Sequence, residues 1–473
     1  MRIELFGKIN RTYVQSLCMM FFHGEKFPQD SEGEEKSLIV EAIDTEKGIA
    51  CKCKLTAYGK TVDSESFAPY GDDEKYERTS KTAVGNAVFK ALSQLTGKSV
   101  PWGILTGIRP SKVAAELIKL TNEKKAIDIL KERYLLSENK ASLAVEVAKN
   151  ECEILSMSEE NTCSVYISIP FCPSRCTYCS FISYATPKLF SLIPEYVLRL
   201  TNDIKRTFDE INEKKLNVLS IYIGGGTPTV LSAEQLDAIL STIDKCTDVS
   251  KLKEFTLEGG RPDTITEEKL KIAKKYGITR FSVNPQSLND NVLLSIGRKH
   301  TVEDFLNAYK LVKDSKIGFI NTDLIAGLDS DTFETFKATI DKIIELSPDN
   351  VTVHSFSVKK SAQILRDNQD IYDKTNDDAI KSVDYAYKML TQNGYIPYYM
   401  YRQKNTICDL ENLGYAKKDT FGIYNVLMMS DCHTVYGIGA GATTKLVSYN
   451  DEILEINRIF SPKYPYEYLQ DKQ

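Results

Sequence analysis

Three cysteines stand close together in the stretch SIPFCPSRCTYCSF, which covers residues 168–181. Cys172, Cys176 and Cys179 are spaced by four and then three positions, and the Pro and Arg between them are typical of a loop. Thiolates gathered in this way bind zinc or an iron–sulfur cluster. A [4Fe–4S] cluster that only carries electrons takes four cysteines, so three cysteines leave one iron with an open position. The spacing therefore favours a four-iron cluster that can bind a substrate or a cofactor directly.

Two other interpretations of these cysteines compete with the cluster. A structural zinc site needs a fourth ligand, commonly from a second CxxC or a histidine pair, and the nearest histidine, His300, lies far along the chain. Three unrelated core cysteines would not be expected on a loop that carries proline and arginine. The remaining cysteines, out of 11 in the chain, are scattered. An odd number of cysteines without a secretion signal argues against a disulfide framework.

The composition is that of a globular protein. The chain has 473 residues, of which 42% are apolar and 26% are charged, and its net charge is −5. This length predicts two or three domains, and the negative charge gives no reason to expect nucleic acid or an anionic membrane as a partner. No apolar run approaches the roughly 18 residues of a membrane span, and the N-terminal residues lack a signal pattern. We expect a cytoplasmic protein.

From residue 164 onward, strand-like apolar runs alternate with amphipathic helical stretches. The six runs are residues 164–169, 218–225, 254–259, 280–285, 319–327 and 350–356. Nearly continuous apolar strands joined by helices predict a parallel sheet with right-handed crossovers. Six repeats predict an α/β fold of the partial (βα)6 TIM-like barrel type.

The sequence on either side of the six repeats has a different pattern. Residues 1–160 combine short strands with amphipathic helices, and TEKG between two of the strands predicts a hairpin. We expect an N-terminal α+β domain there, the barrel at 161–360, and a C-terminal α+β extension at 361–473 that covers the open side of the barrel. In such barrels the functional residues lie on the loops after the strands, which makes polar residues at those positions candidates.

Several residues at the ends of the predicted strands could bind a ligand. GGGTP, residues 224–228, ends the second strand, and glycines let a backbone approach a ligand closely, although a tight turn explains the same letters. Glu258, Gln286, Arg298 and Asp323 lie at or near other strand ends. Each could be an ordinary solvated side chain, but Asp323 stands in an apolar strand, where an unpaired carboxylate is costly.

The CxxxCxxC motif after the first strand of a partial barrel resembles the radical S-adenosylmethionine (SAM) superfamily. The resemblance implies that Cys172, Cys176 and Cys179 bind three irons of a [4Fe–4S] cluster and that SAM binds the fourth. An electron from the cluster would cleave SAM to a 5′-deoxyadenosyl radical, which abstracts hydrogen. The motifs YISIPFCPSRCTYCSF, YIGGGTPT, FTLEGGRPD, RFSVNPQSLND and NTDLIAGL resemble the oxygen-independent coproporphyrinogen III oxidase group. PWGILTGIRP and LENLGYAK are similar to its HemZ branch.

This resemblance also implies a set of ligand contacts. The residues expected to contact SAM are Tyr166, Tyr178, Gly225, Gly226, Thr227, Glu258, Gln286, Arg298, Asp323 and Ser357. A substrate with four propionates would need cations and hydroxyl donors, and the candidates are Arg402, Lys404, Tyr399 and His354. A strand or sheet edge rich in aromatic residues also explains the run YIPYYMYRQK. The implied partner is an electron donor such as flavodoxin or ferredoxin.

The implied function is the oxygen-independent oxidative decarboxylation of coproporphyrinogen III propionates to vinyl groups in heme biosynthesis. Two departures from the family pattern keep alternatives open. Phe181 stands where the decarboxylating enzymes carry a fourth cysteine, a form shared with the heme chaperones, and Glu411 stands where the chaperones carry the His of an HNxxYW motif. The alternatives are a heme-binding, chaperone-like protein with a [4Fe–4S] cluster, or a radical SAM enzyme acting on another tetrapyrrole.

Overall fold

The computed structural model describes residues 1–22, 24–28, 35–71, 76–107, 109–179, 187–357, 377–403, 406–450 and 453–471. These residues form two compact units. The first contains Met1–Ala148 and Met400–Glu411, and the second contains the other described residues from Lys149 onward. The division into three domains stays a prediction.

The first unit is built on a four-stranded sheet in the order β1-β2-β3-β4. Its strands are β1 (Arg2–Phe6), β2 (Ser37–Thr45), β3 (Gly48–Ala57) and β4 (Lys60–Pro69). Strand β1 is parallel to β2, and the other pairs are antiparallel. The predicted hairpin is confirmed, because β2 and β3 pair across the TEKG turn.

Helices complete this unit on one side of the sheet. They are α1 (Arg11–Phe21), α2 (Tyr76–Thr96), α3 (Pro110–Leu120), α4 (Glu123–Glu132) and the start of α5 (Glu138–Leu155). Helix α2 lies against β4, where the Ser64 hydroxyl donates to the Ala87 carbonyl over 2.6 Å. The charged residues of β3, such as Lys52 and Lys54, are exposed and alternate with buried apolar ones, so the other face of the sheet is polar.

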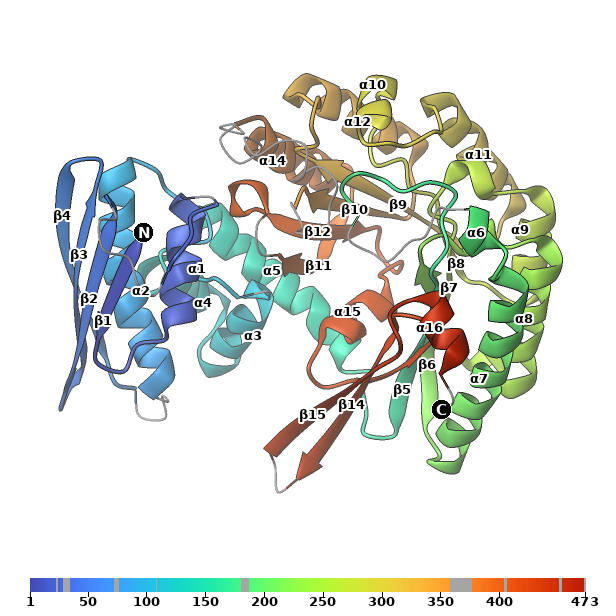
Figure 1. Ribbon diagram of the computed structural model, residues 1–473, viewed down its shortest axis with the longest axis horizontal. Helices are drawn as coiled ribbons and strands as arrows, with labels where there is room; N and C mark the ends of the chain where they lie inside the picture. The colour runs from blue at the N-terminus through green and yellow to red at the C-terminus, as the bar shows by residue number, and fades with distance from the viewer. Residues whose placement is uncertain are drawn as a thin grey trace. The chain divides into compact units, whose positions relative to one another are not determined.

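The second unit contains the predicted six parallel strands, each hydrogen-bonded to the next. They are β5 (Thr162–Ile169), β6 (Asn217–Gly225), β7 (Glu254–Glu258), β8 (Arg280–Ser282), β9 (Phe319–Ala326) and β10 (Asn350–Ser355). The connecting helices are α6 (Pro187–Phe190), α7 (Ile193–Glu213), α8 (Ala233–Cys246), α9 (Glu267–Lys275), α10 (Asp290–Ser295), α11 (Val302–Ser315) and α12 (Phe333–Leu346). Figure 1 shows α7, α8, α9 and α11 along the outer side of the strands. The partial (βα)6 barrel is confirmed.

C-terminal strands extend the barrel sheet at both of its edges. They are β11 (Ile396–Arg402), β12 (Glu411–Ala416), β13 (Thr434–Ile438), β14 (Thr443–Asn450) and β15 (Ile453–Phe460). Strand β12 is antiparallel to β10, and β13 is parallel to β5, which gives the order β11-β12-β10-β9-β8-β7-β6-β5-β13-β14-β15. The other α-helices of the described residues are α14 (Asp377–Gln392), α15 (Ile423–Met429) and α16 (Pro465–Gln470).

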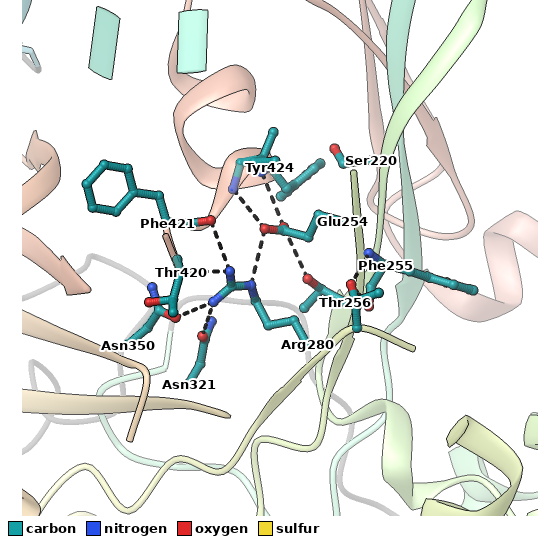
Figure 2. Close-up of polar contacts among 12 residues, drawn as sticks. Ser220, Glu254, Phe255, Thr256, Arg280, Asn321, Asn350, Thr420, Phe421 and Tyr424 are labelled. Carbon is teal, nitrogen blue, oxygen red and sulfur yellow. Dashed lines mark hydrogen bonds and ion pairs between the residues drawn. The ribbon is translucent and has the colours of Figure 1, made fainter. Parts of the chain in front are cut away.

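A buried arginine closes the end of the barrel where the strands begin. Arg280, the first residue of β8, pairs through Nε with Glu254 Oε2 at 3.2 Å. Its Nη1 donates to the Asn321 side chain over 2.8 Å, and Nη2 donates to the carbonyl of Thr420 over 2.9 Å. Figure 2 shows this guanidinium between the strands and the segment before α15. In barrels of this kind the functional residues lie at the opposite end, on the loops after the strands.

Candidate radical SAM site

The cysteine loop leaves the carboxyl end of β5. Cys172 and Cys176 are buried, Cys179 is partly exposed, and none of the three is in a disulfide. The Thr177 N–H donates to the Ile296 carbonyl over 3.1 Å, which fastens the loop to the segment after α10. The Cys172 Sγ lies 3.2 Å from the Thr227 hydroxyl. The loop therefore holds two of its three sulfurs in the interior, against the ends of neighbouring strands.

The glycines at the end of β6 allow it to lie against the start of this loop. A Cβ on Gly226 would lie 2.5 Å from the Phe171 carbonyl oxygen, and one on Gly225, where φ is +118°, would lie 2.9 Å from the Ile169 nitrogen. The Gly226 N–H donates to the Ile169 carbonyl over 2.8 Å. Only glycine fits such contacts. These glycines have a packing role, and their part in SAM binding stays a prediction.

Glu258 ends β7 inside the barrel, where it lies close to Asp323 of β9. Burial, and after it the nearby Asp323 carboxylate, raise the pKa of Glu258 to about 8, although hydrogen bonds from the Tyr222 hydroxyl and the Gly225 N–H act in the opposite direction. Asp323 accepts a hydrogen bond from the Asn284 amide over 2.8 Å. Burial and the neighbouring carboxylate both disfavour the ionised form of Glu258, and a cation bound beside it would favour that form.

Gln286 and Arg298 lie on the neighbouring loops. Gln286 has a left-handed backbone, with φ of +70°, and its N–H donates to the Asp323 carbonyl over 3.0 Å. The Arg298 guanidinium is buried; Nη1 donates to the Asn284 carbonyl over 2.7 Å, and Nη2 donates to the Tyr178 hydroxyl over 3.3 Å. Arg298 thus links the cysteine loop to the segment after β8. The structure brings these predicted residues together around one end of the barrel.

Tyr166 and Ser357 complete the predicted SAM contacts. Tyr166 stacks on Tyr222 and on Tyr424, with ring centroids 6.2 Å apart in both pairs. Ser357 is buried just after β10. Tyr222 and Asn284 hold the carboxylates of the site, and they were not singled out from the sequence. Tyr222 stands in an apolar strand, where alternate side chains point to opposite faces of the sheet. That alternation is the feature of the sequence from which its inward direction could have been predicted.

The four substrate candidates are placed differently. His354 on β10 lies with its Nε2 4.0 Å from Asp323 Oδ2. Tyr399 is buried in the second unit, and Lys404 lies outside the described residues. Arg402 is buried in the first unit, where it pairs with Asp409 and lies over the Trp102 ring, 5.4 Å from its centroid. Its charge is therefore already neutralised within that unit.

Glu411, which replaces the chaperone histidine, is also paired in the first unit. It is almost completely buried, with Oε1 2.6 Å from the Lys140 ammonium and Oε2 accepting from the Trp102 indole N–H over 2.8 Å. Burial alone would raise its pKa, but the Lys140 ammonium and the Trp102 hydrogen bond hold the pKa below its ordinary value. Both carboxylate oxygens are used within the protein.

Comparisons with known proteins point to one family. A model of the radical SAM superfamily matches residues 166–343. The chain is 32% identical over 438 residues to the oxygen-independent coproporphyrinogen-III oxidase-like protein HemZ of Bacillus subtilis, which is 91% of this chain and 86% of that protein. It is 33% identical over 309 residues to the heme chaperone HemW of Haemophilus influenzae, with coverage of 63% and 74%.

One solved structure of the same superfamily also resembles the chain. It is the coproporphyrinogen III oxidase HemN of Escherichia coli, a radical SAM enzyme, with 20% identity and a TM-score of 0.49. The likeness covers 63% of this chain and 67% of that one.

Radical SAM proteins use a [4Fe–4S] cluster and SAM, and the residues around the cysteine loop fit these groups. Within the described part of the chain, no three His, Cys, Asp or Glu side chains are grouped so that they could hold a single metal ion. A [4Fe–4S] cluster does not require such a group, because each of its cysteine thiolates binds a different iron atom. Buried donors usually have partners, yet several near this loop have none among the described residues. They are Thr177 Oγ1, Arg261 Nη2, Arg298 Nε and both ring nitrogens of His300. Because 32% of its residues are identical to those of HemZ over most of both proteins, this chain belongs to the HemZ family within the radical SAM superfamily.

Proposed function

We propose that this protein is a radical SAM enzyme that converts propionate side chains of coproporphyrinogen III to vinyl groups. Cys172, Cys176 and Cys179 would hold the cluster, and SAM would bind between them and the carboxyl groups of Glu258 and Asp323. When bound, these groups supply a 5′-deoxyadenosyl radical, which removes one hydrogen atom from the substrate. The observation that carries the proposal is a loop with two buried cysteines after β5 in the same barrel as Glu258, whose pKa is raised by burial and by the nearby Asp323.

The two carboxyl groups are suited to an ammonium ligand. In the absence of a cation, Glu258 is protonated at neutral pH because its pKa is raised to about 8. An ammonium placed beside it favours the ionised form and would therefore release that proton. SAM affinity is accordingly expected to increase as the pH rises from 6 toward the pKa of Glu258, until the carboxyl group no longer has to lose a proton on binding.

The substrate step requires the protein to hold a propionate while it loses a β-hydrogen. Removal of a hydrogen atom from the β-carbon, loss of CO₂ and transfer of one electron to an acceptor convert a propionate to a vinyl group. His354, whose Nε2 lies 4.0 Å from Asp323 Oδ2, is our candidate for a contact with the propionate. An electron donor such as flavodoxin or ferredoxin would reduce the cluster.

The alternative of a heme chaperone is supported by the HemW relatives. One observation disfavours it for this chain. Glu411 stands in place of the heme-binding histidine, and its carboxylate is buried and bound on both oxygens by Lys140 and Trp102. A carboxylate held in this way has no lone pair directed at a heme iron. We therefore place radical chemistry on a tetrapyrrole ahead of heme carriage.

Anaerobic reconstitution with iron and sulfide tests the proposal directly. The reduced protein is incubated with SAM and coproporphyrinogen III, and both 5′-deoxyadenosine and porphyrin products are measured by liquid chromatography with mass spectrometry. We expect 5′-deoxyadenosine and a product that has lost CO₂, with neither formed by Cys176→Ala. SAM cleavage without a vinyl product would indicate another tetrapyrrole. Tight heme binding without SAM cleavage would indicate a carrier instead.

The exposed Cys432 provides a matched control. It lies outside the cysteine loop, so Cys432→Ala removes a thiol without removing a proposed cluster ligand. The Cys432→Ala protein is expected to keep its iron content and its 5′-deoxyadenosine yield. If Cys176→Ala and Cys432→Ala had the same activity, the assignment of the cluster to this loop would be wrong.

A further inference from the structure

Arg261 is a buried cation beside the cysteine loop. It follows Glu258 in the stretch EGGRPD and is 3% exposed. Its Nη1 donates to the Ser174 hydroxyl over 2.9 Å and lies 3.9 Å from Cys176 Sγ, within hydrogen-bonding range for sulfur. Its Nε pairs with Asp263 Oδ1 at 3.2 Å. The guanidinium thus reaches from the loop after β7 to two residues of the cysteine loop.

One nitrogen of this guanidinium has no partner within the part of the chain that the structure describes. Arg261 Nη2 is buried and makes no hydrogen bond among the described residues. An unpaired buried donor is costly, so a nitrogen of this kind indicates an acceptor that the described residues do not supply. The other terminal nitrogen of the same guanidinium, Nη1, lies 3.9 Å from the Sγ of Cys176, which is one of the proposed cluster ligands. An acceptor beside the Cys176 sulfur would satisfy Nη2.

We infer that Arg261 is a positioning residue that donates hydrogen bonds to the Cys176 thiolate and the adjoining cluster and raises the cluster's reduction potential. The inference rests on the proposed assignment of the cluster to Cys172, Cys176 and Cys179, and it is independent of the substrate. Reduction adds one negative charge to the cluster. Hydrogen bonds to the sulfurs, and the net charge around them, set the potential of such clusters, so a buried cation here favours the reduced state.

Asp263 allows the effect of the Arg261 charge to be tested separately from a structural role. The Asp263 carboxylate, 3.2 Å from Arg261 Nε, partly neutralises the guanidinium. Loss of Asp263 should therefore raise the potential, whereas loss of Arg261 should lower it. Ser174 carries no charge, and its hydroxyl only accepts from Nη1. A purely structural role for Arg261 would give no such opposite signs.

The experiment is a redox titration of the reconstituted full-length protein, with the reduced cluster followed by electron paramagnetic resonance. For Arg261→Met we expect the ratio of reduced to oxidised cluster at a fixed potential to fall on the order of tenfold, which is about 59 mV for a one-electron couple. Arg261→Lys should fall between Met and wild type, and Asp263→Asn should shift in the opposite direction. Lys299→Met, which removes the exposed cation that follows Arg298 in the sequence, should leave the potential unchanged.

The outcomes separate this inference from the cluster assignment. If the wild-type protein takes up no iron and sulfide, the assignment of the cluster fails. If Arg261→Met loads normally and keeps the wild-type potential, the cluster assignment stands and the role of Arg261 is refuted. If Arg261→Met does not load, Arg261→Lys and Asp263→Asn decide, because equal potentials in these two variants and in wild type would equally refute the role.

Discussion

Replacement of Glu258 by Gln should stabilise the protein without its cofactors, and the gain should depend on pH. The carboxyl pKa is about 8 in the folded protein and 4.5 when unperturbed. Because the folded pKa is raised, the folded state favours the protonated form, and its stability is lost as pH rises from about 4.5 to about 8. Above that range the loss is constant. Gln carries no charge, so the variant escapes this loss.

The size of the effect follows from the two pKa values. One pKa unit corresponds to about 1.36 kcal/mol, so the penalty that Glu258 imposes is about 1 kcal/mol at pH 5, about 2 kcal/mol at pH 6, and reaches an upper bound of about 5 kcal/mol at pH 9. The difference in unfolding free energy between Glu258→Gln and wild type should therefore grow by about 4 kcal/mol, at most, from pH 5 to pH 9. Any constant effect of the amide group cancels in this comparison.

Urea denaturation under reducing conditions, followed by far-UV circular dichroism at pH 5, 6, 7, 8 and 9, measures this difference. Glu213→Gln, which alters an exposed carboxylate at the end of α7, is the matched control and should show no such trend. A stability difference for Glu258→Gln that stays flat across the pH range would refute the reasoning, because it would mean that the carboxyl group is not held protonated in the folded state. The same variant should bind SAM more weakly, since it removes one of the two proposed ammonium partners.

Other substitutions test the barrel, the first unit and the strand ends. Arg280→Met should cost about 3–5 kcal/mol in urea unfolding because it leaves Glu254 buried and unpaired, and the double variant with Glu254→Gln should recover part of that loss. Lys140→Met should raise the pKa of Glu411, which the Lys140 ammonium lowers in the wild type. The free energy of unfolding of the variant, measured by the fluorescence of the single tryptophan, should therefore fall as the pH rises above about 4.5. Equal pH profiles for the variant and the wild type would contradict this. Gly226→Ala should lower the iron content after reconstitution, because the new methyl group would displace the cysteine loop; a full iron content would contradict the packing role.

Among the described residues, no helix has both the length and the apolar character of a membrane span. This agrees with the sequence, which has no long apolar run. The expected cellular location and the electron donor stay predictions.

Much of the barrel could be predicted because its signals are local. Each strand is a short apolar run, and each helix has its own amphipathic pattern, so the order of elements follows from neighbouring residues. The position of Glu258, Gln286 and Asp323 near one end of the sheet follows from the same order, since parallel strands end on the same side. The cysteine motif is also local. These features needed no knowledge of contacts between distant residues.

The role of Arg402 could not be predicted in the same way. From the sequence it was a cation beside tyrosines, and therefore a candidate for binding propionates. Its guanidinium is instead paired with Asp409 and lies over Trp102, which is about 300 residues away in the chain. The sequence shows that a residue is charged but not whether a residue of opposite charge neutralises it. That partner is brought into contact only by the packing of segments that are distant in the chain.

The sequence by itself determined the order of the six strands, the three-cysteine loop after the first and the polar residues after the others, because these depend on residue type and short spacing. The tertiary structure alone decided which charges have a partner of opposite sign and which do not. Glu254 and Arg280 satisfy each other at the start of the strands, Glu411 is satisfied by Lys140, and Glu258 is left beside another carboxyl group. The physical reason is that the energy of a buried charge depends on the distance to its partners in space, and residues far apart in the chain set that distance.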